Sequence, residues 1–231
     1  MAISALTRGA AGIVKVLPYA DVYLIGGPSG AGKTAFAKVF SNLRPVVVLQ
    51  LDDYFLDEKV VRVSLSSRYG RARQWDHPAS VDLSLALRNT IELLDHDSTQ
   101  VPSFSFAQNR RVGYRSCSRS SKESILVEGL HALELQSHVG VFSTSVYSIF
   151  INAEVSIRRK RISVRDARNR SRPLHEFDRR FHFMRIAETR WILPQRRKAD
   201  LIIDTSDGGF RIVEHDCKPG VLKKRRGEKK N

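Results

Sequence analysis

The segment Gly27–Thr34 places the tightest constraint on how this chain can fold. Its sequence, GPSGAGKT, matches the pattern G-x-x-x-x-G-K-[ST] in full, between a short apolar run at 21–25 and a segment with helical spacing at 34–43. Glycines let backbone N–H groups converge on phosphate oxygens, and a helix N-terminus adds a favourable dipole. The sequence therefore predicts a phosphate-binding loop between a buried strand and a helix.

Within this loop, Lys33 is expected to reach the β- and γ-phosphates of ATP, and the hydroxyl of Thr34 is expected to ligate Mg²⁺. The predicted ATP-binding residues of the loop are Gly27, Ser29, Gly30, Ala31, Gly32, Lys33 and Thr34. GTPases, helicases, transporters and small-molecule kinases all use such a loop, so the loop alone does not define a function. The carboxylates and cations elsewhere in the chain must discriminate among these classes.

The rest of the chain alternates apolar strands with helical segments. The predicted strands are 21–25, 46–51, 124–127, 146–151 and 201–204. The predicted helices are a short lead-in at the N-terminus, 34–43, 81–95, 157–168 and 176–191. Because apolar strands without polar alternation indicate a parallel sheet covered on both faces, we predict an α/β, doubly wound P-loop NTPase fold. We expect one domain over residues 1–210, followed by a basic tail at 211–231 that we expect to be flexible.

The charge of the 231-residue chain is unusual, at +15. One basic block spans Arg158–Arg190, with twelve Lys and Arg against four Asp and Glu, and another, KKRRGEKK, spans Lys223–Lys230. Such a surplus favours polyanionic partners. No apolar stretch approaches ~18 residues, so we expect no membrane span. Two cysteines cannot build a disulfide framework, and we expect reduced thiols in a cytoplasmic protein.

Two carboxylate positions follow predicted strands. Asp52 and Asp53 come directly after the strand VVVLQL, and Glu128 ends the strand SILV. The carboxyl ends of parallel strands meet in one crevice, so Asp52 is expected to take the proton of an attacking alcohol. Glu128 stands at the position that holds Mg²⁺. It is followed by Gly129 rather than forming an Asp-Glu pair, which weighs against a helicase or transporter.

The stretch RRKRISVRDARNRSR, residues 158–172, is densely basic. Arg161, Arg165 and Arg168 share one helical face, and Arg170 and Arg172 follow. In a phosphoryl-transfer enzyme such a face forms a lid that neutralises charge on the transferred group. An RNA-binding stripe and a solvated helix face remain alternatives.

Taken together, these motifs resemble the uridine kinase family, within the wider uridine kinase and phosphoribulokinase group of P-loop kinases. The resemblance extends from about Val22 to Asp204 and includes motifs in the family's order. They are GGPSGAGKT, LQLDDYF, WDHPASVD, VPSFSF as a hairpin element, ILVEG, VRDARNRSR and PQRRKADLII. The resemblance implies ATP and Mg²⁺ as cofactors and transfer of the γ-phosphate to the alcohol group of a small molecule.

The resemblance also assigns residue roles. It makes Asp52 the catalytic base, acting with Lys33 and Arg165, and it gives Glu128 the Mg²⁺ role alongside Thr34. It implies that Asp76 binds ribose hydroxyls. It places phosphate contacts on Arg165 and Arg170, and a substrate contact on Arg172.

The departures from the family pattern fall on the acceptor side. Phe104 replaces the tyrosine that approaches the base, Asn109 stands where a histidine reads the pyrimidine, and the paired lid arginines read Arg161-Ile162. Additional arginines, Arg179 and Arg180, lie near a substrate-side glutamine position. We expect a nucleoside or another ribose or polyol acceptor. One alternative is an anionic acceptor, such as a sugar phosphate or an acid. Another is a nucleic-acid-associated role through the basic tail. The protein could also form homo-oligomers.

Overall fold

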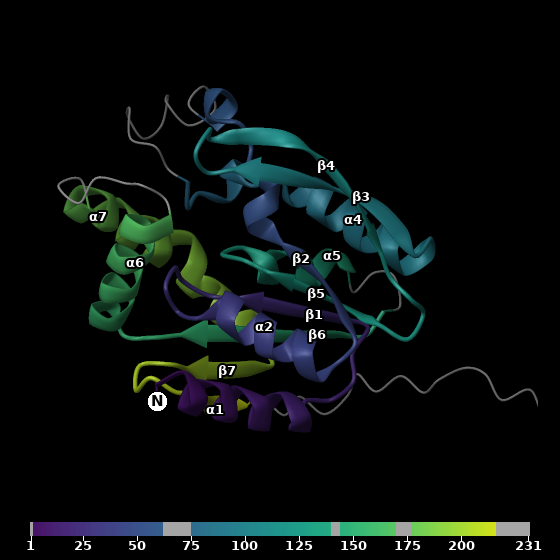
Figure 1. Cartoon of the computed structure of the whole chain (residues 1–231), viewed down its shortest axis with the longest axis horizontal. Helices are drawn as coiled ribbons and strands as arrows, with labels where there is room; N and C mark the ends of the chain where they lie inside the picture. Colours follow the sequence, from purple (N-terminus) through teal and green to yellow (C-terminus); the bar gives the residue numbers. More distant parts are fainter. Residues whose placement is uncertain (1, 62–74, 140–143, 170–176, 216–231) are drawn as a thin grey trace, which may run out of the picture.

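The computed structural model describes residues 2–61, 75–139, 144–169 and 177–215. A six-stranded sheet runs through the centre of the molecule in the order β2-β5-β1-β6-β7-β8 (Figure 1). Its strands are β1 (Val22–Gly26), β2 (Val46–Gln50), β5 (Ser124–Glu128), β6 (Val146–Asn152), β7 (Leu201–Asp204) and β8 (Arg211–His215). All neighbours pair in parallel except β7 and β8, which are antiparallel. The predicted α/β fold with its parallel sheet is confirmed.

Helices cover both faces of this sheet. They are α1 (Ala2–Val16), α2 (Lys33–Leu43), α4 (Leu83–Asp95) and α5 (Gln136–Val139), while α6 (Val155–Asn169) and α7 (Phe177–Ala187) lie beside one end of the sheet (Figure 1). On one face, Tyr23 and Ile25 of β1 pack with Phe36 and Phe40 of α2 and with the buried side of α1. On the other face, Val22 and Leu24 belong to the core that includes α4. Every residue of β1 is buried, which explains its continuous apolar sequence.

Short irregular helices connect the main elements. They are η1 (Leu51–Tyr54), η2 (Pro78–Ser80), η3 (Ala132–Leu135), the π-helix η6 (Glu188–Ile192) and the 3₁₀ helix η7 (Leu193–Lys198). The predicted strand 46–51 ends one residue early because Leu51 opens η1. The predicted helix 81–95 begins at Leu83 because the carboxylate of Asp82 accepts the Leu85 amide and caps α4.

A two-stranded antiparallel sheet lies apart from the main one (Figure 1). It consists of β3 (Ser98–Ser105) and β4 (Arg110–Ser118), where the sequence indicated only a hairpin element at VPSFSF. Its register shifts at Ser103 and Phe104.

The sheet also continues beyond the predicted domain boundary. Residues 211–215, which the sequence analysis assigned to a flexible tail, form β8 on the edge of the sheet. The rest of that tail, including KKRRGEKK, lies outside the described residues. Within the part of the chain that the structure describes, none of the helices has both the length and the apolar character needed to span a bilayer.

Candidate active site

The phosphate loop folds against the end of β6. Gly27 has φ +133°, and a Cβ atom there would lie 2.0 Å from the carbonyl oxygen of Ile151. Only glycine fits such a close approach with a positive φ. The loop then enters α2, whose first residue is Lys33. The predicted strand, loop and helix are therefore present in this order, with the loop at the carboxyl end of β1.

Lys33 is a buried cation at the centre of the site. Its side chain is 9% exposed, and its ammonium group donates a hydrogen bond of 3.1 Å to the carbonyl oxygen of Pro28. Burial lowers its pKa. Glu128, Asp52 and Asp76 oppose this effect and Arg165 adds to it. The structure thus brings the predicted lysine within electrostatic range of three predicted carboxylates and the predicted lid arginine.

Glu128 connects the end of β5 to the phosphate loop. Its carboxylate accepts a hydrogen bond of 2.9 Å from the hydroxyl of Thr34. Burial raises the pKa of Glu128, and the nearby Lys33 ammonium is the main opposing influence. Gly129 lets β5 approach η1 closely, since a Cβ there would lie 2.5 Å from Cβ of Leu51.

The hydroxyl and carboxylate oxygens of this pair suit Mg²⁺, which takes oxygen ligands and keeps phosphate and water in its shell. Among the described residues, no group of three or more histidine, cysteine or acidic side chains is arranged to hold a metal ion. A magnesium ion at Thr34 and Glu128 would therefore depend on phosphate oxygens for much of its coordination.

Asp52 lies in η1 at the carboxyl end of β2. In the register of the sheet, Gln50 of β2 pairs with Glu128, so Asp52 follows the partner of Glu128 by two residues. Asp52 contributes to the raised pKa of Glu128, after burial, which raises it, and Lys33, which lowers it. The neighbouring Asp53 accepts a hydrogen bond of 3.0 Å from Arg115 on β4. The two consecutive aspartates therefore have different surroundings.

Asp76 is held by a histidine that the sequence analysis missed. Nε2 of His131 lies 3.0 Å from the carbonyl oxygen of Asp76. Burial lowers the pKa of His131 to about 4, so the imidazole is neutral near pH 7, and Nε2 must carry the proton because a carbonyl only accepts. Its only sequence signal is a polar residue within the apolar run LHAL.

Phe104 belongs to a group of four aromatic side chains. It packs against Phe55, Phe106 and Trp75 with ring centroids 5.4–6.1 Å apart. Asn109, the other predicted acceptor residue on the hairpin, has φ 49°, and its carbonyl oxygen accepts the amide of Glu58 at 3.0 Å. Asparagine tolerates this left-handed conformation. The structure therefore gives Asn109 a turn-forming role.

The predicted arginine lid lies on α6 and α7. Arg165 donates to the buried carboxylate of Asp166, and Arg180 of α7 donates to its other oxygen at 3.3 Å. A second cluster joins Arg158 and Glu188 through two hydrogen bonds of 2.8 Å, with Arg185 also bound to Glu188. These carboxylates hold α6 against the chain around α7. Arg170 and Arg172 lie outside the described residues.

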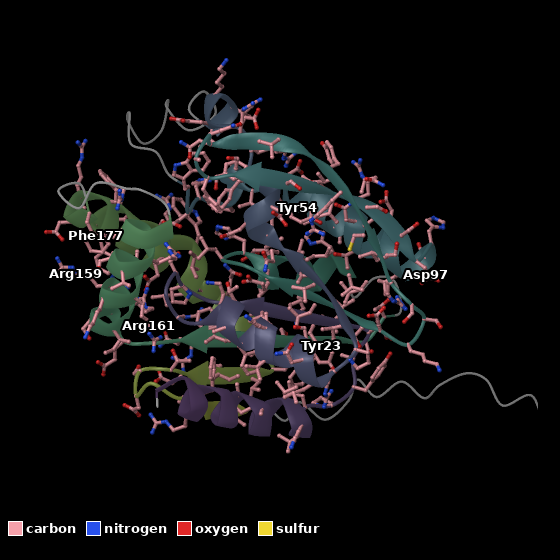
Figure 2. The ribbon with its side chains drawn as sticks, viewed as in Figure 1. Tyr23, Tyr54, Asp97, Arg159, Arg161 and Phe177 are labelled. Carbon is pink, nitrogen blue, oxygen red and sulfur yellow. The ribbon has the colours of Figure 1, made fainter. Side chains whose placement is uncertain are left out.

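Arg161 lies on α6, within the helix that the sequence predicts. Its guanidinium donates to the carbonyl oxygens of Gly30, at 3.2 Å, and Thr205, at 2.8 Å. Figure 2 shows it on α6. The hydroxyl of Thr205 in turn donates to the carbonyl of Ala31 at 2.7 Å. Arg161 therefore braces the phosphate loop against the end of β7, and the substrate contact expected for it stays a prediction.

The site contains a small pocket beside the phosphate loop. It lies between the phosphate loop and the lid, lined by Ser29, Asp76, Arg158, Met184 and Glu188 among others. These features are typical of the class of P-loop kinases. They are a phosphate loop with a buried lysine, a carboxylate at the end of the adjacent strand, an aspartate after the next strand, and an arginine-rich helix.

Comparison with known proteins narrows this class. The model of the phosphoribulokinase / uridine kinase family matches residues 22–207, and the chain belongs to this family. It is an ATP-dependent phosphotransferase. The uridine kinase of Macrococcus caseolyticus is 26% identical over 196 residues, which cover 83% of this chain and 90% of that protein.

Solved structures share the fold at lower identity. D-glycerate 3-kinase from Cryptococcus neoformans superimposes with a TM-score of 0.60 at 14% identity, over 90% of this chain and 97% of that chain. Phosphoribulokinase from Rhodobacter spheroides gives a TM-score of 0.56 at 14% identity, over 80% of this chain and 70% of that one.

Proposed function

We propose that the enzyme transfers the γ-phosphate of ATP to the alcohol group of a nucleoside or another ribose or polyol acceptor, with Asp52 as the general base. The observation that carries this proposal is the electrostatic cluster around Lys33, in which Asp52, Asp76 and Glu128 all act on one buried ammonium group. The cluster joins the phosphate loop to carboxylates of η1, the segment 75–82 and β5. A base and a phosphate-binding cation must be neighbours in this way for direct transfer.

The phosphate side of the reaction falls to residues at the carboxyl ends of β1 and β5. Backbone amides of the phosphate loop and the Lys33 ammonium would hold the phosphates, while Thr34 and Glu128 would hold Mg²⁺, which neutralises developing charge. Arg165 would leave Asp166 to contact the transferred group. Arg170 is proposed to assist on sequence grounds.

The acceptor side falls to Asp52, Asp76 and Phe104. Asp76 offers a carboxylate to the two hydroxyls of a ribose, and the aromatic group around Phe104 offers an apolar surface for a flat ring. Arg172 is proposed to contact the acceptor on sequence grounds alone. The relatives named uridine kinase support a nucleoside acceptor.

The experiment is an acceptor panel of nucleosides, sugars and sugar phosphates with ATP and Mg²⁺. Asp52→Asn should lower kcat by about 10²- to 10⁴-fold, because general base catalysis contributes that much, while ATP binding stays near wild type. Asp53→Asn is the matched control, since its carboxylate is bound by Arg115. Wild-type turnover in Asp52→Asn would refute the assignment of the base.

A second acceptor class is favoured by the cluster at Asp166. Arg165 and Arg180 share this one buried carboxylate, so the cluster carries more positive than negative charge. An anionic acceptor, such as a sugar phosphate or an acid, would be attracted by it. In the same panel, preferential turnover of anionic acceptors that falls in Arg180→Met would favour this class over a neutral nucleoside.

A further inference from the structure

The acceptor half of the site comes from three segments that are far apart in sequence. Asp52 lies in the turn Leu51–Phe55, Asp76 lies in the segment 75–82, and Phe104 lies on the hairpin formed by β3 and β4. We propose that Arg111, on β4, is a positioning residue that fixes these segments relative to one another and so aligns Asp52 for proton transfer. This inference rests on the proposed function, and it concerns a residue that the sequence analysis did not single out.

The Arg111 side chain makes hydrogen bonds to two of the other segments. Its Nε donates to the carbonyl oxygen of Phe55 at 3.1 Å, and one terminal nitrogen donates to the carbonyl oxygen of Tyr54 at 3.0 Å. The same terminal nitrogen donates to the Asp82 carboxylate at 3.1 Å. The side chain is 20% exposed. Figure 2 shows Tyr54 between the hairpin and the main sheet.

Backbone contacts strengthen the same junction. The amide of Asp82 donates to the carbonyl of Tyr54, and the amide of Leu56 donates to the carbonyl of Ser80, both at 2.9 Å. The amide of Arg111 donates to the Asp57 carboxylate at 2.8 Å. Residues 54–57, 80–82 and the start of β4 are therefore tied together in the stretch of chain that follows Asp52.

A guanidinium group is suited to this place. The carbonyl of Phe55 follows η1, where helical partners run out, and the carbonyl of Tyr54 accepts Arg111 in addition to the Asp82 amide. Arginine offers several donors in a rigid planar fork, whereas lysine offers a compact charge without this geometry. The Asp82 carboxylate both receives Arg111 and caps α4 through its other oxygen, so the start of α4 is fixed as well.

The hairpin links the proposed acceptor contact to the turn that carries the proposed base. Phe104 pairs with Arg111 in the hairpin register, so the aromatic residue proposed to contact the acceptor and the arginine that holds the Asp52 turn are cross-strand partners. Arg115 on the same strand adds the contact to Asp53. An acceptor bound against the hairpin is thereby held in register with Asp52, and a misplacement of about 1 Å would cost about 10²-fold in rate.

The chain offers a matched control at the next position. Arg110 points to the other side of β4, as neighbouring strand residues do, and it is exposed and bonds to Gln108 within the hairpin turn. Arg110→Met makes the same chemical change as Arg111→Met, but at a residue that has no contact with the junction. Asp82→Asn is a further variant, which keeps a cap oxygen for α4 but removes the charge that faces Arg111.

The experiment compares Arg111→Met, Arg111→Lys, Asp82→Asn and Arg110→Met with the wild-type enzyme. We expect Arg111→Met to lower kcat about 10- to 100-fold, by the cost of misplacing a catalytic group, and to raise amide hydrogen exchange in residues 51–57. The KM for ATP should be unchanged, because the phosphate loop is not involved. The kcat values of Arg111→Lys and Asp82→Asn should lie between those of Arg111→Met and the wild type. Arg110→Met should have the wild-type kcat.

Chemical rescue distinguishes a positioning role of Arg111 from a role in folding alone. In Arg111→Ala, added guanidinium ion should restore part of kcat, whereas the same concentration should leave Arg110→Ala unaffected. The inference is overturned if Arg111→Met equals Arg110→Met in both turnover and exchange, or if its loss of activity follows ATP binding instead. Asp52→Asn in the same assay separates the two proposals. Its normal turnover would refute the base assignment, while hydrogen exchange would still decide whether Arg111 fixes the turn.

Discussion

The phosphate half and the acceptor half of this site are built in different ways. The phosphate half consists of backbone and side chains at the carboxyl ends of adjacent parallel strands, where Gly27 is packed against Ile151 and Thr34 bonds to Glu128. The acceptor half is assembled from a 3₁₀ turn, the segment 75–82 and a separate hairpin, joined by side chains such as Arg111. If the proposed function holds, the residues for phosphate transfer are anchored in the central sheet, whereas acceptor choice depends on elements that can vary independently.

The largest expected effect concerns the lid that covers the phosphate half. Arg158 and Glu188 are 2% and 4% exposed, and they form a buried ion pair. Glu188→Gln should destabilise the protein by about 3–5 kcal/mol, because removing one partner leaves an uncompensated buried charge. Chemical denaturation measures this change. Asp178→Asn, which removes the exposed partner of Arg159, should change stability by about 1 kcal/mol or less, and equal losses in the two variants would contradict the buried pairing.

The next effect tests the phosphate loop directly. Lys33→Met should lower phosphate transfer by about 10²- to 10³-fold with every acceptor, which is the usual cost of losing one preorganised charge-stabilising donor. ATP affinity should fall in the same variant, as isothermal titration would measure. Lys38→Met, on the exposed side of α2, is the control. Selective loss with only one acceptor would show that Lys33 belongs to the acceptor half.

A third prediction concerns His131, which connects the loop after β5 with the acceptor segment. Its pKa is about 4 in the folded chain against 6.5 ordinarily, so between these values the unfolded chain binds a proton that the folded chain does not. Its contribution to stability is therefore complete above pH 6.5 and is lost as the pH falls towards 4, by about 3 kcal/mol in all.

His131→Gln should flatten the dependence of unfolding free energy on pH over this window, as denaturation at several pH values would measure. The exposed His138 provides the control, since His138→Gln should leave the slope in place. An unchanged slope in His131→Gln would mean that the imidazole is accessible to protons in the folded protein.

The smallest effect sharpens the acceptor half. Phe104→Tyr adds a hydroxyl at the position where the family places a tyrosine. It should favour acceptors whose ring offers a hydrogen-bonding partner by about 5-fold in kcat/KM over plain polyols, since one hydrogen bond contributes about 1 kcal/mol. The KM for ATP should not move. A change in ATP binding instead of acceptor preference would contradict the division between the halves.

The sequence predicted the strand, loop and helix of the phosphate half because their signals are local. A continuous apolar strand, a glycine-rich loop and a helix follow one another directly, and Asp52 and Glu128 each stand at a strand end. The acceptor junction instead depends on contacts between distant segments. Arg111 bonds to residues more than fifty positions away at Tyr54 and Phe55, and no local pattern reveals such a partner.

Arg161 illustrates the same limit. Its place on a basic helix predicts a lid residue, but its contact with Thr205 joins positions 44 apart and turns it towards the phosphate loop. Asn109 likewise carries a sequence signal for substrate recognition and takes a backbone conformation with φ 49° in a turn. The residue types were informative, but their direction was set by the tertiary structure.

The most direct measurement is the structure of this enzyme with Mg²⁺, a non-hydrolysable ATP analogue and the best acceptor from the panel. The account predicts that a carboxylate oxygen of Asp52 lies within hydrogen-bonding distance of the acceptor hydroxyl, with that hydroxyl facing the terminal phosphorus above the Lys33 ammonium. A complex in which the hydroxyl meets another group, with Asp52 turned away from it, would contradict the account.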